Sequence, residues 1–253
     1  MNKLSFKNPK VNNGEEIYFY TVDTKDGFCV QLGELLIEEH YKSGLIKKDM
    51  VVVDCGANVG IASYYFKDWA KQIYALEPNS KNYECLVRNV EEHKLDNVKT
   101  YKFGLAARKS VETLRTNGDT GIAESLFGSG LVSEPVTLLS IKDFMDKEGI
   151  DHIDLLKMDT EGSEYIIFPS HDFELLAPKI DYIIGESHYL ANLVPDYLVP
   201  VLDDVGFDVK FLPITNMFLK FSFDDVVHKQ YSIDKQTLFL AKRKDLPWPE
   251  GLN

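Results

Sequence analysis

Short apolar runs alternate with amphipathic stretches along most of this 253-residue chain, from about residue 45 onward. Each run ends at an acid, a glycine or a polar turn, which is typical of the buried strands of a parallel sheet. Strands that alternate with helices in this way predict an α/β fold, an open and mostly parallel sheet with helices on both faces. The predicted strands are 50–54, 72–76, 97–103, 153–158, 182–185, 207–212 and 237–241.

Apolar positions three or four residues apart predict the helices between these strands. The first helix has its apolar positions at Ile61, Tyr65 and Trp69. The second begins near Asn79 or Ser80, because either side chain can cap it. Its predicted buried stripe consists of Tyr83, Leu86, Val87 and Val90. A later helix at 196–205 contains Pro200, which we expect to kink or shorten it.

The first 44 residues have a different pattern, with a polar arm followed by two short apolar runs. These runs, Ile17–Val22 and Phe28–Leu32, flank an Asp-Gly turn signal and predict a small hairpin, followed by a short helix. We therefore divide the chain into an N-terminal arm and small β/α cap at 1–44 and a main domain at 45–253. Within the main domain, the glycine-rich stretch 115–134 is expected to be either a surface loop or a cover over the active site.

The charge and cysteine content of the chain indicate which classes of partner and compartment to expect. The net charge is −12, from 40 acids and 28 bases, and no cluster of Lys and Arg offers the basic surface that nucleic acid requires. The three cysteines have no disulfide or metal-ligand spacing, so we expect a reducing, cytoplasmic compartment. The N-terminus lacks the apolar core of a signal peptide, and no apolar run approaches the ~20 residues of a membrane span. We expect neither a nucleic-acid nor a membrane partner.

Candidate chemistry begins where the first strand ends, in the segment Asp54-Cys-Gly56-Ala57-Asn58-Val-Gly60. A tight strand-to-helix turn of this kind is where an open parallel sheet binds a nucleotide-like cofactor. A dinucleotide site has the pattern G-x-G-x-x-G, whereas this segment has two glycines with an acid ahead of them. That acid would repel a pyrophosphate and attract a cation. S-adenosylmethionine has a sulfonium, an ammonium and no phosphate, so the segment favours it over NAD.

A second acid follows the next strand, in the segment Glu77-Pro78-Asn79. It comes about twenty residues after the first, which is the offset expected for the residue that binds the ribose hydroxyls of the cofactor. A carboxylate suits this task because its two oxygens can accept hydrogen bonds from both hydroxyls. We therefore assign Glu77, with Pro78 and Asn79, to cofactor binding.

Together these segments resemble the FkbM family of class I methyltransferases. The matching segments are Asp54–Gly60, Leu76–Asn79, Asp154–Glu164 with its D-x-E-G-x-E pattern, and the final strand Thr237–Lys242. The D-x-E-G-x-E segment is the most specific of them, and the resemblance spans roughly residues 45–242. It implies a Rossmann-like, seven-stranded, mostly parallel sheet with a C-terminal antiparallel strand, and S-adenosylmethionine as the methyl donor.

The resemblance also implies roles for single residues and a class of acceptor. The adenine is expected beside Gly104 and Leu105, and Asp159 is expected to contact the ammonium of the cofactor. Hydroxyls of small molecules and sugars are common acceptors in the family, so O-methylation of such a hydroxyl is the preferred function. The oligomeric state is left open, with a homodimer as one option.

A hydroxyl acceptor must lose its proton during the transfer, so a titratable group is expected at a strand end. Two strands provide such groups, Asp159 with Glu161 after the fourth and Glu186 with His188 after the fifth. His188 suits a general base because imidazole titrates near neutral pH. The four residues are the predicted catalytic set. A purely structural role for His188 is the alternative.

The same residues are also compatible with other functions. Asp159, Glu161, Glu186 and His188 are mostly oxygen ligands and could hold Mg²⁺, but the sequence lacks the acid and amide pattern of known metal-dependent O-methyltransferases. We therefore assign no metal ligand. An N-methyltransferase acting on a small amine would share the whole cofactor site. A non-catalytic cofactor-binding protein and a nicotinamide dehydrogenase are less favoured alternatives.

Overall fold

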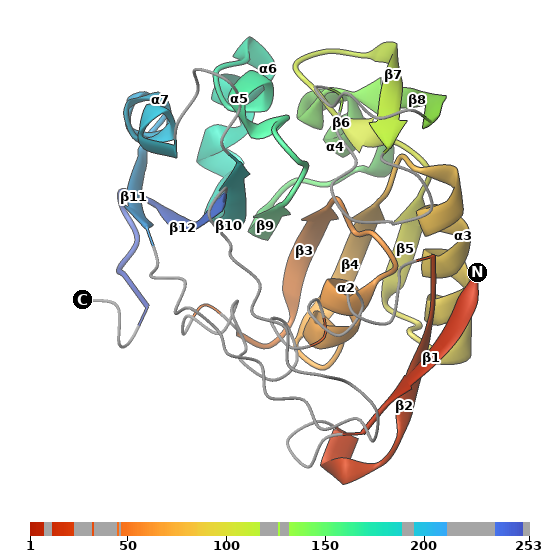
Figure 1. Ribbon diagram of the computed structural model, residues 1–253. Helices are drawn as coiled ribbons and strands as arrows, with labels where there is room; N and C mark the ends of the chain where they lie inside the picture. Colours follow the sequence, from red (N-terminus) through yellow and green to blue (C-terminus); the bar gives the residue numbers. More distant parts are fainter. Residues whose placement is uncertain are drawn as a thin grey trace.

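The computed structural model describes residues 1–7, 12–22, 32, 45, 47–116, 126, 132–188, 195–211 and 236–249. Its centre is a seven-stranded sheet of order β11-β12-β10-β9-β3-β4-β5 (Figure 1). β12 runs antiparallel to both of its neighbours and the other neighbouring pairs are parallel, which confirms the expected fold. The strands are β3 (Met50–Cys55), β4 (Ala70–Leu76), β5 (Val98–Tyr101), β9 (Ile153–Met158), β10 (Ile180–His188), β11 (Phe207–Phe211) and β12 (Gln236–Arg243).

The strand order of the sheet creates a point that favours ligand binding. From β3 the chain builds outward through β4 to β5, and it then returns to the other side of β3 to form β9 and β10. The direction of building therefore reverses between β3 and β9. In open α/β sheets, ligands bind at the carboxyl ends of the strands beside such a reversal. The segments after Cys55 and Met158 are thus in the position expected for a site.

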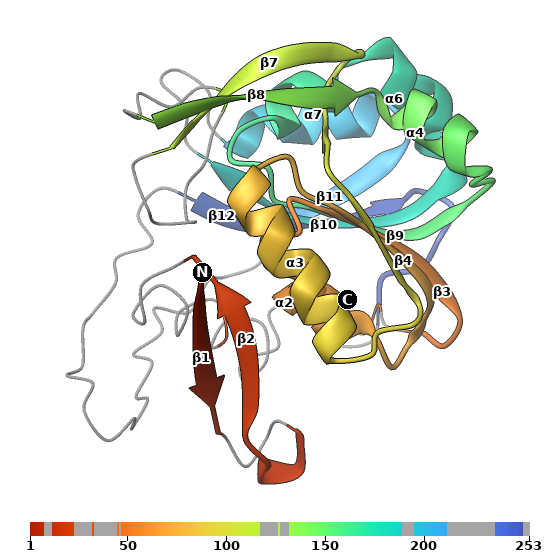
Figure 2. The same cartoon turned by 90° about the vertical axis from the view of Figure 1, so that its right-hand side faces the viewer.

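Helices cover both faces of the sheet (Figures 1 and 2). One face packs against α2 (Ile61–Phe66) and α3 (Ser80–Glu92), whose Phe66 and Leu86 share a core with Val52 and Ile73 of the sheet. The opposite face packs against helices that follow in the second half of the chain. These are α4 (Ile141–Glu148), α5 (Glu164–Ile167), α6 (His171–Leu176) and α7 (Leu198–Asp204).

Three 3-10 turns complete the helical elements of the described residues, and they are η1 (Asn12–Gly14), η3 (Ala177–Lys179) and η4 (Pro195–Tyr197). None of the described helices has the length and apolar character that a membrane crossing requires.

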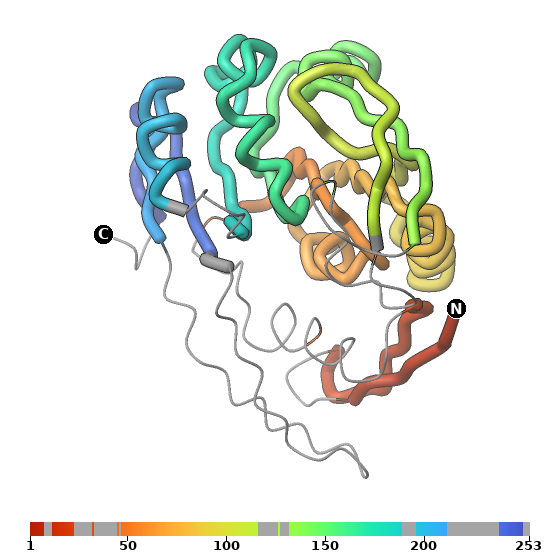
Figure 3. Tube along the Cα trace, turned by 45° about the horizontal axis from the view of Figure 1, so that its top comes forward, coloured from red at the N-terminus to blue at the C-terminus, as the bar shows by residue number. Residues whose placement is uncertain are grey.

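The N-terminal arm contains a strand that the sequence pattern did not predict. β1 (Asn2–Phe6) pairs antiparallel with β2 (Ile17–Thr21), on the far side of the molecule from β11 and β12 (Figure 3). Phe6 is buried along with the inward residues of β2, so the two strands close part of the main core. Leu32 is helical rather than extended, and the remainder of the second expected strand lies outside the described residues. The domain division at residue 44 stays a prediction.

α3 begins where expected but is rotated relative to the predicted stripe. Asn79 caps it by accepting hydrogen bonds from the backbone N–H groups of Lys81 and Asn82. Its buried residues are Asn82, Cys85, Leu86 and Asn89, whereas Tyr83, Val87 and Val90 are half-buried. The rotation occurs because Asn89 has a partner on each side. Its side chain donates to the carbonyls of Tyr20 and Val59, each at 2.8 Å, and so ties the N-terminal hairpin to the loop after β3.

The strand expected at 97–103 ends early, at Tyr101. Residues Gly104–Leu105 form β6, which belongs to a separate three-stranded sheet with β7 (Ser110–Thr116) and β8 (Val132–Leu139). The stretch expected to be a loop at 115–134 therefore starts and ends within an antiparallel hairpin, in which Thr116 is opposite Val132. Between these strands only Leu126 is described, and it packs against the small core of this sheet.

Two helices and one strand differ in length from the predictions. α2 ends at Phe66, so Trp69 lies beyond it. Pro200 does not kink α7, because it lies in the first turn, where a backbone N–H has no partner within the helix. β10 continues to His188, so Glu186 and His188 lie within the strand rather than after it.

Candidate functional site

The loop after β3 is fixed against the end of β4. The backbone N–H groups of Gly56 and Ala57 both donate to the carbonyl of Leu76, each at 3.0 Å, and Gly60 N–H closes the turn onto Ala57 at 2.8 Å. Gly56 has φ +72°, and a Cβ at this position would lie 1.8 Å from the carbonyl oxygen of Asp159. The close packing of Asp159, at the end of β9, therefore requires glycine at position 56, whether or not a ligand also approaches the backbone here.

Glu77 lies directly at the end of β4 and orients this loop. One carboxylate oxygen accepts from the N–H of Asn58 and the other from the N–H of Asn79, each at 2.8 Å. The side chain is buried, and burial raises the pKa of Glu77 to about 7 against the two hydrogen bonds, which lower it. Pro78 follows, and a Cβ on Gly104 would lie 3.3 Å from it. The structure thus brings Gly104 and the buried Leu105 next to the segment that follows β4.

Asp54 is completely buried and bonded within the protein. Its Oδ2 accepts from Ser63 Oγ at 2.7 Å, and its Oδ1 lies 3.2 Å from Nζ of Lys157 on the neighbouring strand β9. Lys157 also donates to the carbonyl of Gly56 at 2.8 Å. Burial alone would lower the pKa of Lys157, but Asp54 and Asp159 raise it above its ordinary value. Lys157 was missed as a site residue, although a lysine inside an otherwise apolar buried strand was a visible signal.

Asp159 is the first residue beyond β9 and is more open than Asp54. Its N–H donates to the carbonyl of Cys55 at 3.2 Å, which continues the pairing of β9 with β3. Its side chain is 28% exposed, and one oxygen lies 3.6 Å from Nζ of Lys157. Of the two acids at this switch point, Asp159 is therefore the one that a ligand can reach.

Three predicted catalytic residues come together at this edge. One ligand atom from each of Asp159, Glu161 and His188 can be chosen so that all three atoms lie within 4.8 Å of one another. His188 Nε2 is 3.3 Å from Glu161 Oε2, while the imidazole is 10% exposed and the Glu161 side chain 29% exposed. Within the described part of the chain, neither ring nitrogen of His188 makes a hydrogen bond. We refer to these residues below as the Asp159–Glu161–His188 cluster.

The charges of the cluster influence one another. Burial raises the pKa of Glu161 to about 7, with His188 opposing that shift and Asp159 adding to it. Burial alone would lower the pKa of His188, but Glu161, Glu164 and Asp159 raise it above its ordinary value. The imidazole therefore lies in a strongly negative environment.

Residues behind the cluster hold it in place. Glu164 is fully buried and accepts from both the N–H and the hydroxyl of Thr160, each at 2.8 Å, which fixes the turn that carries Glu161. Tyr165 donates its hydroxyl to the carbonyl of His188 at 2.9 Å. These contacts indicate a structural role for Glu164.

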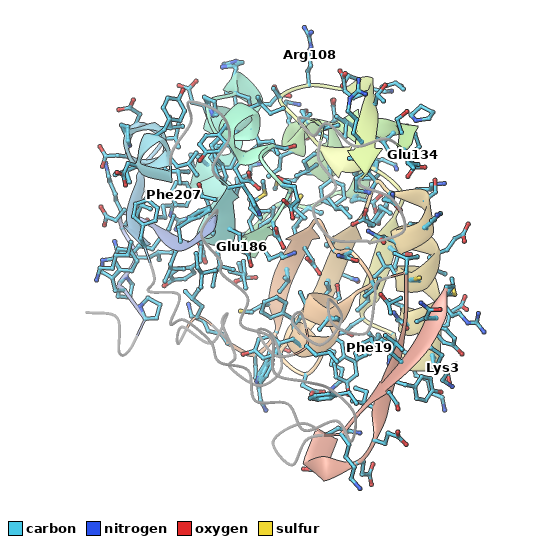
Figure 4. The ribbon with its side chains drawn as sticks, in the orientation of Figure 1. Lys3, Phe19, Arg108, Glu134, Glu186 and Phe207 are labelled. Atoms are coloured by element: carbon cyan, nitrogen blue, oxygen red, sulfur yellow. The ribbon has the colours of Figure 1, made fainter. Side chains whose placement is uncertain are left out.

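Glu186 lies two residues before His188 on β10 (Figure 4). Side chains alternate along a strand, so Glu186 projects from the same face of the sheet as His188. It is half-buried and close enough to raise the pKa of Lys157. The four predicted catalytic residues therefore share one end of β9 and β10, and their individual roles stay predictions.

Comparison with known proteins identifies the family of this chain. The family model of the Methyltransferase FkbM domain matches residues 54–209, which include the loop after β3, β4 and the turn after β9. The chain belongs to the FkbM methyltransferase family. Methyltransferase sdnD of Sordaria araneosa is 24% identical over 237 residues, which cover 79% of this chain and 90% of the relative. Methyltransferase 1 of Beauveria bassiana is also 24% identical, over 56% of this chain and 66% of the relative.

Solved structures support the fold of this FkbM methyltransferase. A precorrin-6y C5,15-methyltransferase from Geobacter metallireducens matches with a TM-score of 0.50 and 15% identity, covering 89% of this chain and 94% of that one. An FkbM methyltransferase from Methylobacillus flagellatus has a TM-score of 0.50 and 16% identity, covering 79% of this chain and 46% of that one. At this level of identity, both likenesses concern the fold alone.

Proposed function

We propose that this FkbM methyltransferase transfers a methyl group from S-adenosylmethionine to a hydroxyl of a small molecule or sugar. The observation that carries the proposal is the Asp159–Glu161–His188 cluster, which lies at the switch point of the sheet beside the glycine loop. A titratable cluster next to the cofactor loop is what removal of a hydroxyl proton requires. The net charge of −12 also favours a small acceptor over nucleic acid.

The residues around the loop fit the proposed cofactor. Glu77 retains acceptor capacity for ribose hydroxyls, because each carboxylate oxygen can accept a further hydrogen bond beyond its backbone contact. Asp159 offers a partly exposed carboxylate to the ammonium group. The loop from Asp54 to Gly60 would follow the methionine portion, and Gly104 and Leu105 would lie along the adenine.

The proposed reaction requires the protein to position the acceptor and to remove one proton from its hydroxyl. When bound, S-adenosylmethionine supplies a methyl group on an activated sulfonium, and the carbon–sulfur bond breaks as the carbon–oxygen bond forms. The chain must align the acceptor and exclude water. The Asp159–Glu161–His188 cluster receives the hydroxyl proton, and Glu186 lies beside it on β10. Lys157 contacts both Asp54 on β3 and Asp159 after β9, and its positive charge offsets theirs.

Transfer from methyl-deuterated S-adenosylmethionine to a panel of sugars, phenols and amines tests this function. Mass spectrometry should find the labelled methyl on oxygen. The His188→Ala variant should bind the cofactor like the parent chain and lose transfer. Label found on nitrogen alone would favour the N-methyltransferase alternative, and full transfer by His188→Ala to a hydroxyl would contradict the role given to the cluster.

A further inference from the structure

We propose that Asp159, Glu161 and His188 bind a divalent metal cation of the Mg²⁺ or Mn²⁺ type. The cation itself is inferred from the geometry of the three side chains. Its use in activating the acceptor hydroxyl rests on the proposed function above.

The spacing of the cluster matches metal coordination. Ligand atoms about 2.1 Å from a shared cation lie roughly 3 to 4.2 Å apart in octahedral geometry. His188 Nε2 and Glu161 Oε2 are 3.3 Å apart, and the three ligand atoms lie within 4.8 Å of one another. Small side-chain rotations are therefore enough to close the site around an ion.

His188 is buried and makes no ring hydrogen bond within the described structure, although its Nε2 lies at ion-pair distance, 3.3 Å, from Glu161 Oε2. The residue is 8% exposed, and both ring nitrogens are without a hydrogen bond to the rest of the described structure. Buried imidazole nitrogens in proteins normally have a partner. A cation on Nε2 would supply one, while Tyr165 fixes the backbone carbonyl of His188 from behind.

The local charge favours a cation as well. Glu164 and Glu186 add to the negative charge of the cluster. Lys157 offsets part of it, because its Nζ lies 3.6 Å from Asp159, but the same ammonium group also pairs with Asp54 at 3.2 Å. One imidazole and two carboxylates leave coordination positions for water or for an acceptor oxygen. A cation at such a position lowers the pKa of a bound hydroxyl, whose proton then leaves to solvent water. With the cation bound, His188 is a metal ligand, and its role as the proton acceptor applies to the metal-free protein.

A second group of similar composition provides a matched control. His152, Asp154 and Asp181 also come within metal-ligand distance of one another, at the opposite ends of β9 and β10. There, Asp181 pairs with Arg243 at 3.1 Å and Asp154 accepts from the N–H of Val51 at 2.8 Å. These oxygens are already used in structural contacts, so this group is expected to leave metal binding unchanged when it is altered.

The test is titration of the tag-free, EDTA-treated chain with Mn²⁺, followed by calorimetry and electron paramagnetic resonance, without cofactor or acceptor. We expect one Mn²⁺ per chain. His188→Gln and Glu161→Gln should each weaken binding by about tenfold or more, and His152→Gln should have no effect. Glu161 is partly exposed, so its variant remains informative if His188→Gln fails to fold.

Three results would overturn the proposal: no Mn²⁺ binding by the parent chain, binding that persists in both Glu161→Gln and His188→Gln, or tight binding of Zn²⁺ with none of Mn²⁺ or Mg²⁺. A parallel titration with S-adenosylmethionine separates this proposal from the proposed function. If the cofactor binds and Mn²⁺ does not, only the metal proposal fails, and His188 is left as a metal-free base. If the cofactor does not bind, the proposed function fails whatever the Mn²⁺ result.

Discussion

Lys157 Nζ lies 3.2 Å from Asp54 Oδ1, and the two residues join the neighbouring strands β9 and β3 at the switch point of the sheet. Both side chains are almost fully buried, at 4% and 0% exposed. The same ammonium group donates to the carbonyl of Gly56 in the cofactor loop. Lys157 therefore stabilises the pairing of β3 with β9 and also holds the backbone of the cofactor loop.

Removing one partner of this ion pair should destabilise the protein strongly. Lys157→Met leaves the buried Asp54 carboxylate without its counter-charge, which typically costs about 3–5 kcal/mol. Asp54→Asn combined with Lys157→Met removes both charges and should recover much of that loss. Unfolding by urea measures all three chains. A loss below about 1 kcal/mol in Lys157→Met would mean that the pair has no structural role.

Gly56→Ala should abolish cofactor binding or folding. The new Cβ would lie 1.8 Å from the carbonyl oxygen of Asp159, so β9 and the loop cannot keep their present separation. Gly149→Ala is the matched control, because Gly149 has a similar φ of +66° and a Cβ added there would meet no atom of the described residues within 4 Å. The control should lose about 1 kcal/mol and still bind S-adenosylmethionine. Equal behaviour of the two variants would show that backbone strain, and not the contact with β9, explains the effect.

The affinity for S-adenosylmethionine should fall as the pH is lowered through about 7. Burial raises the pKa of Glu77 from 4.5 to about 7, and only the ionised carboxylate can accept from both ribose hydroxyls while holding the loop. Well below that pH the affinity should decrease about tenfold per pH unit. Calorimetry from pH 5.5 to 8.5 measures this, with Glu77→Gln as a weak-binding variant whose affinity does not follow the same curve. A flat profile in the parent chain would rule out Glu77 as the controlling group.

The raised pKa of Glu77 has the opposite effect on the stability of the cofactor-free protein, which should fall as the pH rises. With its pKa raised on folding, Glu77 stabilises the native state below pH 4.5, and this contribution is lost as the pH rises through about 7. The free energy of unfolding of Glu77→Gln, compared with the parent chain at pH 6 and pH 8, isolates the effect. The parent chain should lose more stability than the variant between these two values.

Glu134 connects the β7–β8 hairpin to the start of α3 (Figure 4). Its carboxylate accepts from the N–H of Ser80 at 2.8 Å, at the positive end of the helix dipole. Glu134→Gln should therefore lower the free energy of unfolding by about 1 kcal/mol. Glu112→Gln on the neighbouring strand changes the same charge at an exposed position and should have almost no effect. Similar losses in both variants would assign the effect to net charge.

Much of this fold could be predicted from the sequence, because the strands of a parallel sheet are buried on both faces and read as apolar runs. The predicted strand at 153–158 agrees with β9 residue for residue. The β1–β2 hairpin could not be found in this way, because Asn2–Phe6 has one buried side chain and depends on β2 for its pairing. The short β6 likewise exists only through its pairing with β8.

Site residues were predictable where they follow a strand and less so where they lie inside one. The glycine loop and Glu77 could be placed because turn residues and offsets identify them. Lys157 was missed because its partners, Asp54 and Gly56, are about a hundred residues away in sequence. The meeting of Glu161 with His188 depends on β9 and β10 being neighbours, which the alternation of elements implies without fixing the distance.

The most direct test of the cofactor site is a calorimetric titration of the purified chain with S-adenosylmethionine, S-adenosylhomocysteine and NAD. A ligand that binds only the native state adds about 2.7 kcal/mol of stability at a hundredfold excess over its Kd, so a thermal melt provides an independent reading. We predict that the first two ligands bind and stabilise the chain and that NAD does neither. Binding of NAD, or no binding of S-adenosylmethionine by well-folded and ligand-free protein, would contradict the assignment of the cofactor site.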